Sequence, residues 1–283
     1  MINFCLSTLK FYIKKTFKRL QRRLVNNKKN IYLAPIIYGG NNIFFECNKN
    51  SYIEKKVLFH HNHCNYILDS ISEFILDDSY FIDIGANIGT VSLSIAKKFR
   101  KNGLKVLAFE ASERISIKFK RNLNINNLTN VRLLNQALSR NNSIVDFYEP
   151  DDSSFNQGLG SLSKNLDLKK YFKKKIQTRS LDSLLKDEEL TDIKISVIKI
   201  DVQGHEIDIL AGAKETIRRC TPVIVMEYEE QYDDINKCNK LNLLKFIEEF
   251  GYEVFLVDIY EKDIYKKINL ANLRKGNILC IKN

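Results

Sequence analysis

The sequence contains no tryptophan, only three prolines and two methionines, and eleven glycines that follow no period. This scarcity of proline and glycine excludes a collagen-like or proline-rich chain. No apolar run approaches the roughly 20 residues that cross a bilayer, so we expect no transmembrane helix. Because 44% of the 283 residues are hydrophobic, the chain can bury a full core, and wholesale disorder is excluded.

The six cysteines are scattered and include no C-x-x-C pair. The chain is too long for a small disulfide scaffold, and the spacing of a zinc finger is absent. We therefore expect mostly buried, reduced thiols in a cytoplasmic protein.

Positive charge is concentrated at the amino terminus. Nine basic residues precede the first acidic residue, Glu46, and the remaining 36 basic residues face 34 acidic ones, so the body is nearly neutral. That distribution disfavours a nucleic-acid partner for the body.

The basic amino-terminal segment also carries an apolar stripe at helical spacing: Leu6, Leu9, Ile13, Phe17, Leu20 and Leu24. We expect residues 1–30 to be a basic amphipathic helical extension that contacts an anionic membrane or docks on a domain at 31–283.

Beyond the extension, strands and helices alternate. Short strands are expected within 31–59, around a turn at 39–42, and a further strand at 144–148 precedes a polar stretch. The alternating strands are expected at 80–84, 105–109, 131–135, 195–200, 223–227, 253–258 and 278–281, and the helices at 64–76, 89–100, 112–126, 205–219 and 239–250. This order predicts an α/β fold with a mostly parallel sheet covered by helices on both faces.

The most informative segment is a tight glycine turn in the sequence FIDIGANIGT, where an apolar strand ends at Asp83. Gly85 and Gly89 allow a sharp bend and the close approach of a ligand to the backbone. The middle glycine of a dinucleotide motif is missing, and an acid would repel a pyrophosphate. The turn therefore suits S-adenosyl-L-methionine, which carries an ammonium and a sulfonium but no phosphate.

Two further strands end in acids. Glu110 follows the second strand, 27 residues after Asp83, where a carboxylate can accept both hydroxyls of a ribose. Asp201 ends the strand at 195–200 and is followed by His205 and Glu206 at the start of a helix. These titratable groups are expected to meet at the carboxyl edge of the sheet, beside the cofactor.

These blocks resemble the FkbM family of S-adenosylmethionine-dependent methyltransferases. The resemblance covers roughly residues 60–260 and is carried by FIDIGANIGTVSL, VLAFEASERISIKFKRNLNINNLTNV, SLDSLL, ISVIKIDVQGHEIDILAGA and PVIVMEYE. It implies a class I methyltransferase (Rossmann-like) fold, with a seven-stranded sheet that has one antiparallel strand. It also implies methyl transfer, commonly to a hydroxyl oxygen of a sugar, a glycan or a small metabolite.

By position, the resemblance implies a cofactor site. Its members are Asp83, Gly85, Ala86, Asn87 and Gly89 in the turn, Glu110 and Ala111 after the second strand, and Gln136 and Ala137 beside the adenine. The sequence departs from the family at Ala111, where proline is common, and at Asp77-Asp78, where a Pro-Gly turn is common. Neither change removes a ligand group.

An alcohol that attacks a methyl group must lose a proton. Our hypothesis is that His205 or Asp201 is the base and that Glu206 orients it, since histidine ordinarily titrates near pH ~6.5. A divalent metal held by Asp201, Glu206 and Glu227 is a less favoured alternative, because no clear metal spacing is present. We therefore predict no metal site.

Three other features carry weaker signals. His60, His61 and His63 could hold a metal, but adjacent histidines do not easily face one ion. The polar loop at 153–163 is a candidate lid or acceptor site. The lysine run at 169–175 is read as a solvated helix face or an anion site.

Two rival functions remain open from the sequence. Tyr171 and Lys175 match the Tyr-x-x-x-Lys pair of an NAD(P)-dependent short-chain dehydrogenase, although the glycine pattern does not. A non-catalytic module that keeps a methyltransferase fold is the other. Nucleic-acid methylation is disfavoured because no Asn-Pro-Pro-Tyr motif is present.

Overall fold

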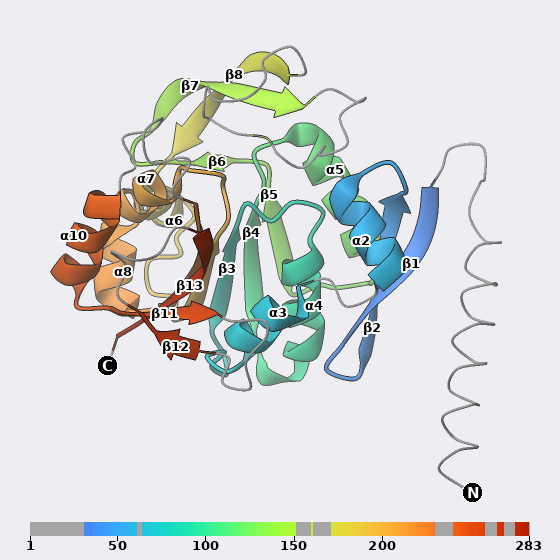
Figure 1. Cartoon of the computed structure of the whole chain (residues 1–283), viewed down its shortest axis with the longest axis horizontal. Coiled ribbons are helices and arrows are strands. Elements are labelled where there is room, and N and C mark those ends of the chain that lie inside the picture. Colours follow the sequence, from blue (N-terminus) through green and yellow to red (C-terminus); the bar gives the residue numbers. More distant parts are fainter. Residues whose placement is uncertain are drawn as a thin grey trace, which may run out of the picture.

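The computed structural model describes residues 31–60, 64–150, 160, 171–229, 240–257, 265–268 and 275–282 (Figure 1). The predictions for the extension at 1–30, for His61 and His63, and for nearly all of the loop at 153–163 lie outside these residues. Within the described part, none of the helices is long and apolar enough to span a membrane. The four described cysteines are free, and two of them, Cys47 and Cys280, are buried.

An eight-stranded sheet forms the centre of the molecule, in the order β12-β11-β13-β10-β9-β3-β4-β5. The five strands from β10 to β5 are parallel, and β13 runs antiparallel to both of its neighbours. This confirms the class I arrangement, to which β12 adds an eighth strand at one edge. The strands are β3 (Tyr80–Ile84), β4 (Lys105–Phe109), β5 (Val131–Leu134), β9 (Ile195–Ile200), β10 (Val223–Glu229), β11 (Glu253–Val257), β12 (Tyr265–Lys267) and β13 (Lys275–Ile281).

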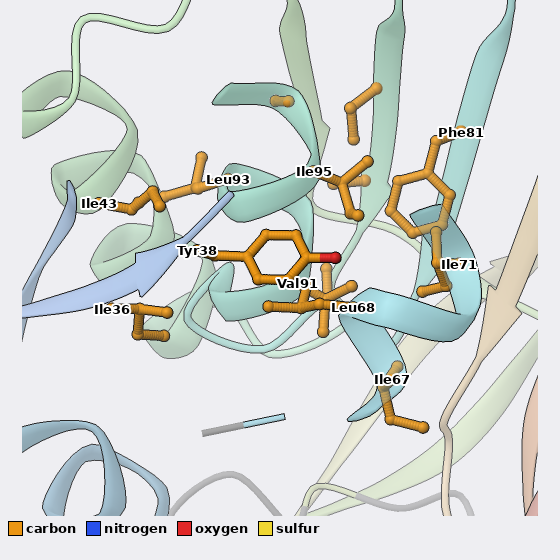
Figure 2. Packing of buried hydrophobic residues seen from close by; sticks show 14 of the residues in the cluster. Ile36, Tyr38, Ile43, Ile67, Leu68, Ile71, Phe81, Val91, Leu93 and Ile95 are labelled. Carbon is orange, nitrogen blue, oxygen red and sulfur yellow. The ribbon is translucent and has the colours of Figure 1, made fainter. Parts of the chain in front are cut away.

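Both faces of the sheet are buried because successive side chains point to opposite faces. In β3, Phe81 enters one apolar cluster and Ile82 enters the other. One face is covered by α6 (Leu181–Asp187), α7 (Glu206–Ala211), α8 (Lys214–Cys220) and α10 (Lys240–Phe250). The other is covered by α3 (Asn65–Ser72), α4 (Thr90–Lys98) and α5 (Glu113–Ile125). The short helix η2 (Arg100–Asn102) follows α4 and has no buried residue. Figure 2 shows the second cluster.

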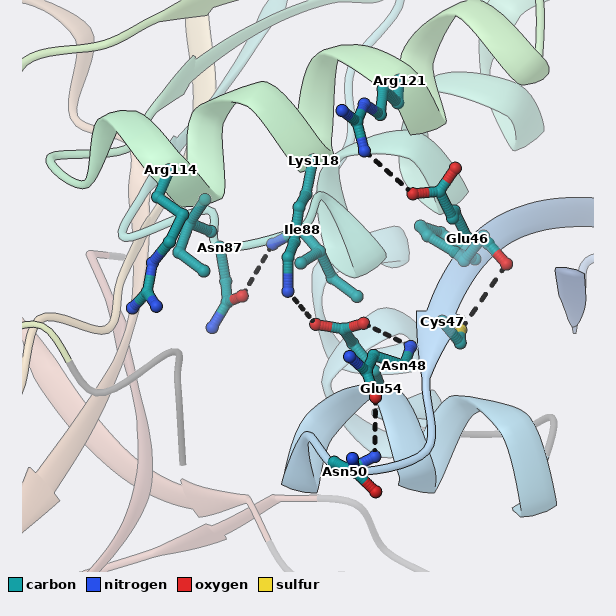
Figure 3. Close-up of polar contacts among 12 residues, drawn as sticks. Glu46, Cys47, Asn48, Asn50, Glu54, Asn87, Ile88, Arg114, Lys118 and Arg121 are labelled. Carbon is teal, nitrogen blue, oxygen red and sulfur yellow. Dashed lines mark hydrogen bonds and ion pairs between the residues drawn. The ribbon is translucent and has the colours of Figure 1, made fainter. Parts of the chain in front are cut away.

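A hairpin of β1 (Ile31–Tyr38) and β2 (Asn41–Asn48), followed by α2 (Tyr52–His60), extends the second layer (Figure 1). Buried Glu54 of α2 joins these elements to α5, because it accepts hydrogen bonds from the Asn48 amide (2.6 Å) and from Lys118 (2.7 Å) (Figure 3). Asn126 adds a second link: its side chain accepts from the Phe44 amide at 2.8 Å and donates to the Phe44 carbonyl at 2.7 Å.

A separate three-stranded sheet lies beside the carboxyl edge of the central sheet (Figure 1). Its order is β6 (Ala137–Leu138), β8 (Tyr171–Arg179), β7 (Ser143–Pro150), and β7 and β8 form an antiparallel ribbon.

The helix face expected for the lysine run was wrong for its described part. Residues 171–175 lie in β8, not on a helix face. Lys173 and Lys175 are exposed while Lys174 and Ile176 are partly covered, which is the two-residue alternation of a strand.

Two other expectations fail for local reasons. The short strands expected within 31–59 are confirmed at 31–38 and 41–48, but residues 52–60 form α2, where Glu54 and Val57 are buried at helical spacing. The helix expected at 205–219 is two helices, α7 and α8, which are separated at Gly212 and Ala213. Gly212 packs against a carbonyl: a Cβ there would lie 2.2 Å from the Ser139 oxygen. Helix α6 was not expected, although Ser180 caps it by accepting a hydrogen bond from the Ser183 amide.

We predict that Asn126→Ala will lower the free energy of unfolding by about 1–3 kcal/mol, because the Phe44 amide and carbonyl lose their partner. Urea denaturation measures the change. Asn124→Ala is the matched control, since Asn124 is an exposed residue of the same helix. Equal losses in the two variants would contradict this account of hairpin docking.

Candidate active site

A cavity of about 270 Å³ lies at the carboxyl edge of the central sheet, where ligands bind in open α/β folds. Its walls come from the segments that follow β3, β4, β5 and β9. Seven of the nine residues predicted to bind the cofactor line it: Gly85, Ala86, Asn87, Glu110, Ala111, Gln136 and Ala137. Among the residues predicted to be catalytic, Asp201 and His205 line it as well.

The glycine turn brings the ends of β3 and β9 together. Gly85 has a φ of 77°, and a Cβ at this position would lie 1.9 Å from the Asp201 carbonyl oxygen. Gly89 has a φ of 89°, and a Cβ there would lie 2.6 Å from the Phe119 ring. Glycine at 89 therefore leaves room for the Phe119 ring, and glycine at 85 lets the ends of β3 and β9 approach each other.

Glu110 is fixed in the cavity wall by two backbone amides. Its carboxylate accepts hydrogen bonds from the Asn87 and Ser112 amides, each at 2.8 Å. Each oxygen has a second lone pair, so the group can accept two more hydrogen bonds from neighbouring hydroxyls of a ribose. Burial raises the pKa of Glu110 to about 7.

Asp83 has a different place from the one that its sequence position indicated. It is fully buried, accepts a hydrogen bond from Ser92 at 2.6 Å and pairs with the Lys199 ammonium at 3.1 Å. It is not among the described residues that line the cavity. Its negative charge is thus already neutralised inside the protein, and the idea that it attracts a cationic group of the cofactor directly finds no support in this geometry.

Lys199 joins Asp83, which lies in β3, to Asp201, which follows β9. Its ammonium lies 3.1 Å from Asp83 and 3.6 Å from Asp201, and it borders the cavity. Although burial opposes the charged form, the two carboxylates raise the pKa of Lys199 above its ordinary value, so the amine stays protonated.

The structure separates Glu206 from the other two residues of the predicted catalytic group. The Glu206 carboxylate accepts hydrogen bonds from the Gly204 amide at 3.1 Å and the Val202 amide at 3.4 Å, and it does not line the cavity. It holds the turn after β9, and burial raises its pKa to about 7.

Asp208, rather than Glu206, lies beside the His205 ring. Its carboxylate is 3.6 Å from His205 Nδ1 and is held from the other side by Arg140 at 3.1 Å. These two neighbours lower the pKa of Asp208. Among the described residues, neither nitrogen of the buried His205 ring has a hydrogen-bond partner. Both ring nitrogens are shielded from solvent, and His205 lines the cavity.

The sequence did not single out several residues of the cavity wall. Gln203 bridges the carboxylates of Asp201 and Glu227, at 3.3 and 3.1 Å. Asn277 lies against the hydroxyl of Tyr66 at 3.5 Å, from segments 211 positions apart. Lys199 offered a signal in the sequence, since it is a charged residue inside an otherwise apolar strand. The pair of Tyr66 and Asn277 offered none. Phe147 of β7 and Gly160 also line the cavity, as do Cys64, Ile53 and Val91.

These residues fit S-adenosylmethionine. Glu110 supplies acceptors for a ribose, the backbone of the turn is open to a ligand at Gly85 and Ala86, and Gln136 and Ala137 lie where the adenine is expected. The part of the chain that the structure describes gathers no group of three or more histidine, cysteine or acidic side chains that could hold a metal ion.

We predict that Gly85→Ala will be far more destabilising than Gly40→Ala. Both glycines have a positive φ, which costs an L-residue about 1–2 kcal/mol, but Gly40 has open space around its Cα whereas an alanine at 85 would strike backbone. The expected loss in free energy of unfolding is roughly 1 kcal/mol for Gly40→Ala and more than about 3 kcal/mol for Gly85→Ala. Urea denaturation of both variants measures the loss in free energy of unfolding. Losses of the same size would show that the β3 and β9 ends are not in contact.

Comparisons with known proteins show the family to which the chain belongs. The family described as "Methyltransferase FkbM domain" matches residues 83–254, which is more than half of the chain. The chain is 28% identical over 151 residues to "Methyltransferase 1" of Beauveria bassiana, covering 48% of this chain and 59% of the relative. It is 30% identical over 166 residues to "2-O-methyltransferase NoeI" of Sinorhizobium fredii, covering 54% and 65%. The matches thus span less than two thirds of either relative.

Among solved structures, similarity is found to an FkbM methyltransferase from Methylobacillus flagellatus KT. The sequence identity is 16%, the TM-score is 0.45, and the match covers 81% of this chain and 54% of that one. A precorrin-6y C5,15-methyltransferase from Geobacter metallireducens GS-15 has a TM-score of 0.41 at 15% identity, with coverage of 76% and 86%. On the family match, the chain belongs to the FkbM methyltransferase family, whose cofactor is S-adenosylmethionine.

Proposed function

We propose that this protein transfers a methyl group from S-adenosylmethionine to a hydroxyl oxygen of a sugar, a glycan or a small metabolite. The observation that carries the proposal is the position of His205. Its buried ring lines the same cavity as Glu110 and the glycine turn, and among the described residues its nitrogens have no hydrogen-bond partner. A base is thus available beside the cofactor residues.

The cofactor would lie across the ends of β3, β4 and β5. Glu110 would accept the ribose hydroxyls, the turn at 85–87 would face the amino-acid part, and Gln136 and Ala137 would border the adenine. Gln136 is fixed for this role, because its side-chain amide donates to the Gln177 carbonyl at 2.8 Å. When bound, the cofactor supplies a methyl group that its sulfonium has already activated.

The protein then has to align the acceptor and remove its proton. His205 accepts the proton that the acceptor hydroxyl loses, and Asp208 stabilises the imidazolium that results. Asp201 is the weaker candidate for the base, since its carboxylate is engaged by Lys199 at 3.6 Å and by Gln203 at 3.3 Å. The carboxylates of Asp201 and Glu227 are placed to accept hydrogen bonds from further hydroxyls of the acceptor.

Oxygen as the methylated atom is supported by one relative in particular. The Sinorhizobium fredii protein is named a 2-O-methyltransferase. The dehydrogenase alternative loses its site in this structure: Tyr171 and Lys175 lie on β8, Lys175 pairs with Asp146 at 3.2 Å, and neither residue lines the cavity.

Product analysis tests the reaction type. The protein is incubated with S-adenosylmethionine labelled in the methyl group and with pools of neutral sugars, glycans and small alcohols. Transfer to a product whose label survives mild alkali shows a methyl ether and supports the proposal. Label lost to alkali shows a methyl ester, and a folded, cofactor-binding protein with no transfer to any pool would favour the non-catalytic module.

We predict that the affinity for S-adenosylhomocysteine will rise with pH up to about 7 and then level off. In the free protein the raised pKa leaves Glu110 about half protonated near pH 7, and ribose hydroxyls donate to its ionised form. Calorimetric titration from pH ~5.5 to ~8.5 gives the dissociation constant at each pH.

Two variants distinguish the effect of Glu110 from that of Glu206, since burial raises the pKa of both to about 7. Glu110→Gln should bind more weakly and lose the pH dependence, whereas Glu206→Gln should keep it, because Glu206 lies outside the cavity. The same slope in Glu110→Gln as in the wild type would contradict the ribose role.

We predict that His205→Gln will lower the rate of methyl transfer about 100- to 10,000-fold, the usual contribution of a positioned base, with little change in cofactor affinity. His60→Gln is the matched control, since His60 is exposed at the end of α2 and should be neutral. Unchanged rates in His205→Gln, Asp201→Asn and Glu206→Gln alike would overturn the assignment of a base on this segment.

A further inference from the structure

The ribbon of β7 and β8 borders the adenine side of the cavity through one face only. Phe147, Glu149 and Lys174 lie on that face, and Phe147 forms part of the cavity wall. The Lys174 ammonium lies over the Phe147 ring, 5.5 Å from its centre. Asp146 and Lys173 belong to the opposite, outer face. The inner face therefore contributes Phe147 to the wall of the candidate cofactor site, and none of the nine predicted cofactor residues lies on it.

Glu149 connects this wall to the loop after β4. Its carboxylate pairs with Lys174 at 2.8 Å and accepts a hydrogen bond from the Ser112 hydroxyl. Arg114, on the first turn of α5, lies 3.9 Å from the same carboxylate and donates to the Pro150 carbonyl at 2.8 Å. Ribbon and loop are thus joined by several charge-assisted contacts at a carboxylate that is 13% exposed.

The Ser112 contact continues to the ribose acid. Ser112 is buried, and its backbone amide donates to the Glu110 carboxylate while its hydroxyl donates to Glu149. The same hydroxyl accepts the Ile115 amide at the start of α5. Glu149 and Glu110 are therefore held by two groups of one residue.

The charges at this point are also coupled. Although burial opposes ionisation, Lys174 and Ser112 lower the pKa of Glu149 below its usual range, so it is ionised at neutral pH. Its negative charge contributes to the raised pKa of Glu110, together with that of Asp83, while the Asn87 and Ser112 amides act in the opposite direction.

We infer that Glu149 is a positioning residue for the cofactor: it fastens the β7–β8 ribbon over the adenosine half of the cavity and, through Ser112, holds Glu110 in place for the ribose. The inference rests on the proposed cofactor role of Glu110. Glu149 itself needs no contact with the cofactor to act in this way.

The test is calorimetric titration of the full chain with S-adenosylhomocysteine, as a function of pH, in Glu149→Gln. The expected result is a dissociation constant raised roughly tenfold or more at pH 7. The pH at which binding levels off should also move down, because the negative charge near Glu110 is gone. Asp146→Asn is the matched control: it removes an acid of the same strand that pairs with Lys173 and Lys175 on the outer face, and both quantities should stay as in the wild type.

Ser112→Ala gives a second route to the same answer. If Glu149 acts through the Ser112 hydroxyl, Glu149→Gln should weaken binding much less in the Ser112→Ala background than in the wild type. Additive losses of affinity in the double variant would show that Glu149 does not act through the Ser112 hydroxyl, and would overturn the inference. A merely structural role for Glu149 would lower the thermal stability and the affinity without moving the pH at which binding levels off, and that result would overturn the inference.

The outcomes also separate this inference from the proposed function. No binding of S-adenosylhomocysteine by the folded wild type would refute the proposed function. Normal binding by the wild type together with unchanged affinity and pH dependence in Glu149→Gln would refute the positioning role alone.

Discussion

A buried ion pair at the centre of the sheet determines where the rest of the site can form. Lys199 of β9 reaches across to Asp83 of β3, and the ammonium is shared with Asp201 at the end of its own strand. Removing one partner of such a pair costs about 3–5 kcal/mol, because the other charge is left buried and uncompensated. The pair holds two adjacent strand ends in register, and the close approach of Gly85 to Asp201 depends on that register. Gly85 and Asp201 both line the cavity, so the cavity lies next to their contact.

Under the proposed function, the cavity would hold the cofactor in one half and the acceptor in the other. One half presents backbone amides, the Glu110 carboxylate and the flat wall formed by Phe147, which suit a nucleoside. The other half presents His205, Asp201 and Glu227, which suit a molecule rich in hydroxyl groups. The two halves meet at the ends of β3 and β9, so a methyl donor in one and an acceptor in the other would face each other across a short gap.

The sequence predicted much of this arrangement because its signals are local. The strand-turn-helix around Gly85 and the acid that ends β4 can each be recognised within about ten residues, and both lie where expected. The role of Asp83 could not be recognised in this way, because its partner Lys199 is 116 positions away. The position of Asp208 beside His205 depends on how α7 begins, where Glu206 turns back to the loop amides. The contribution of the β7–β8 ribbon also escaped the sequence, since the lysines of β8 suggested a helix face and the pairing with β7 sets their alternation.

A crystal structure of the protein with S-adenosylhomocysteine tests the central claim most directly. The account predicts that the ribose hydroxyls lie within hydrogen-bond distance of Glu110, that the adenine lies beside Gln136 and Phe147, and that the sulfur faces His205. A ligand bound elsewhere, or one whose ribose makes no contact with Glu110, would contradict it.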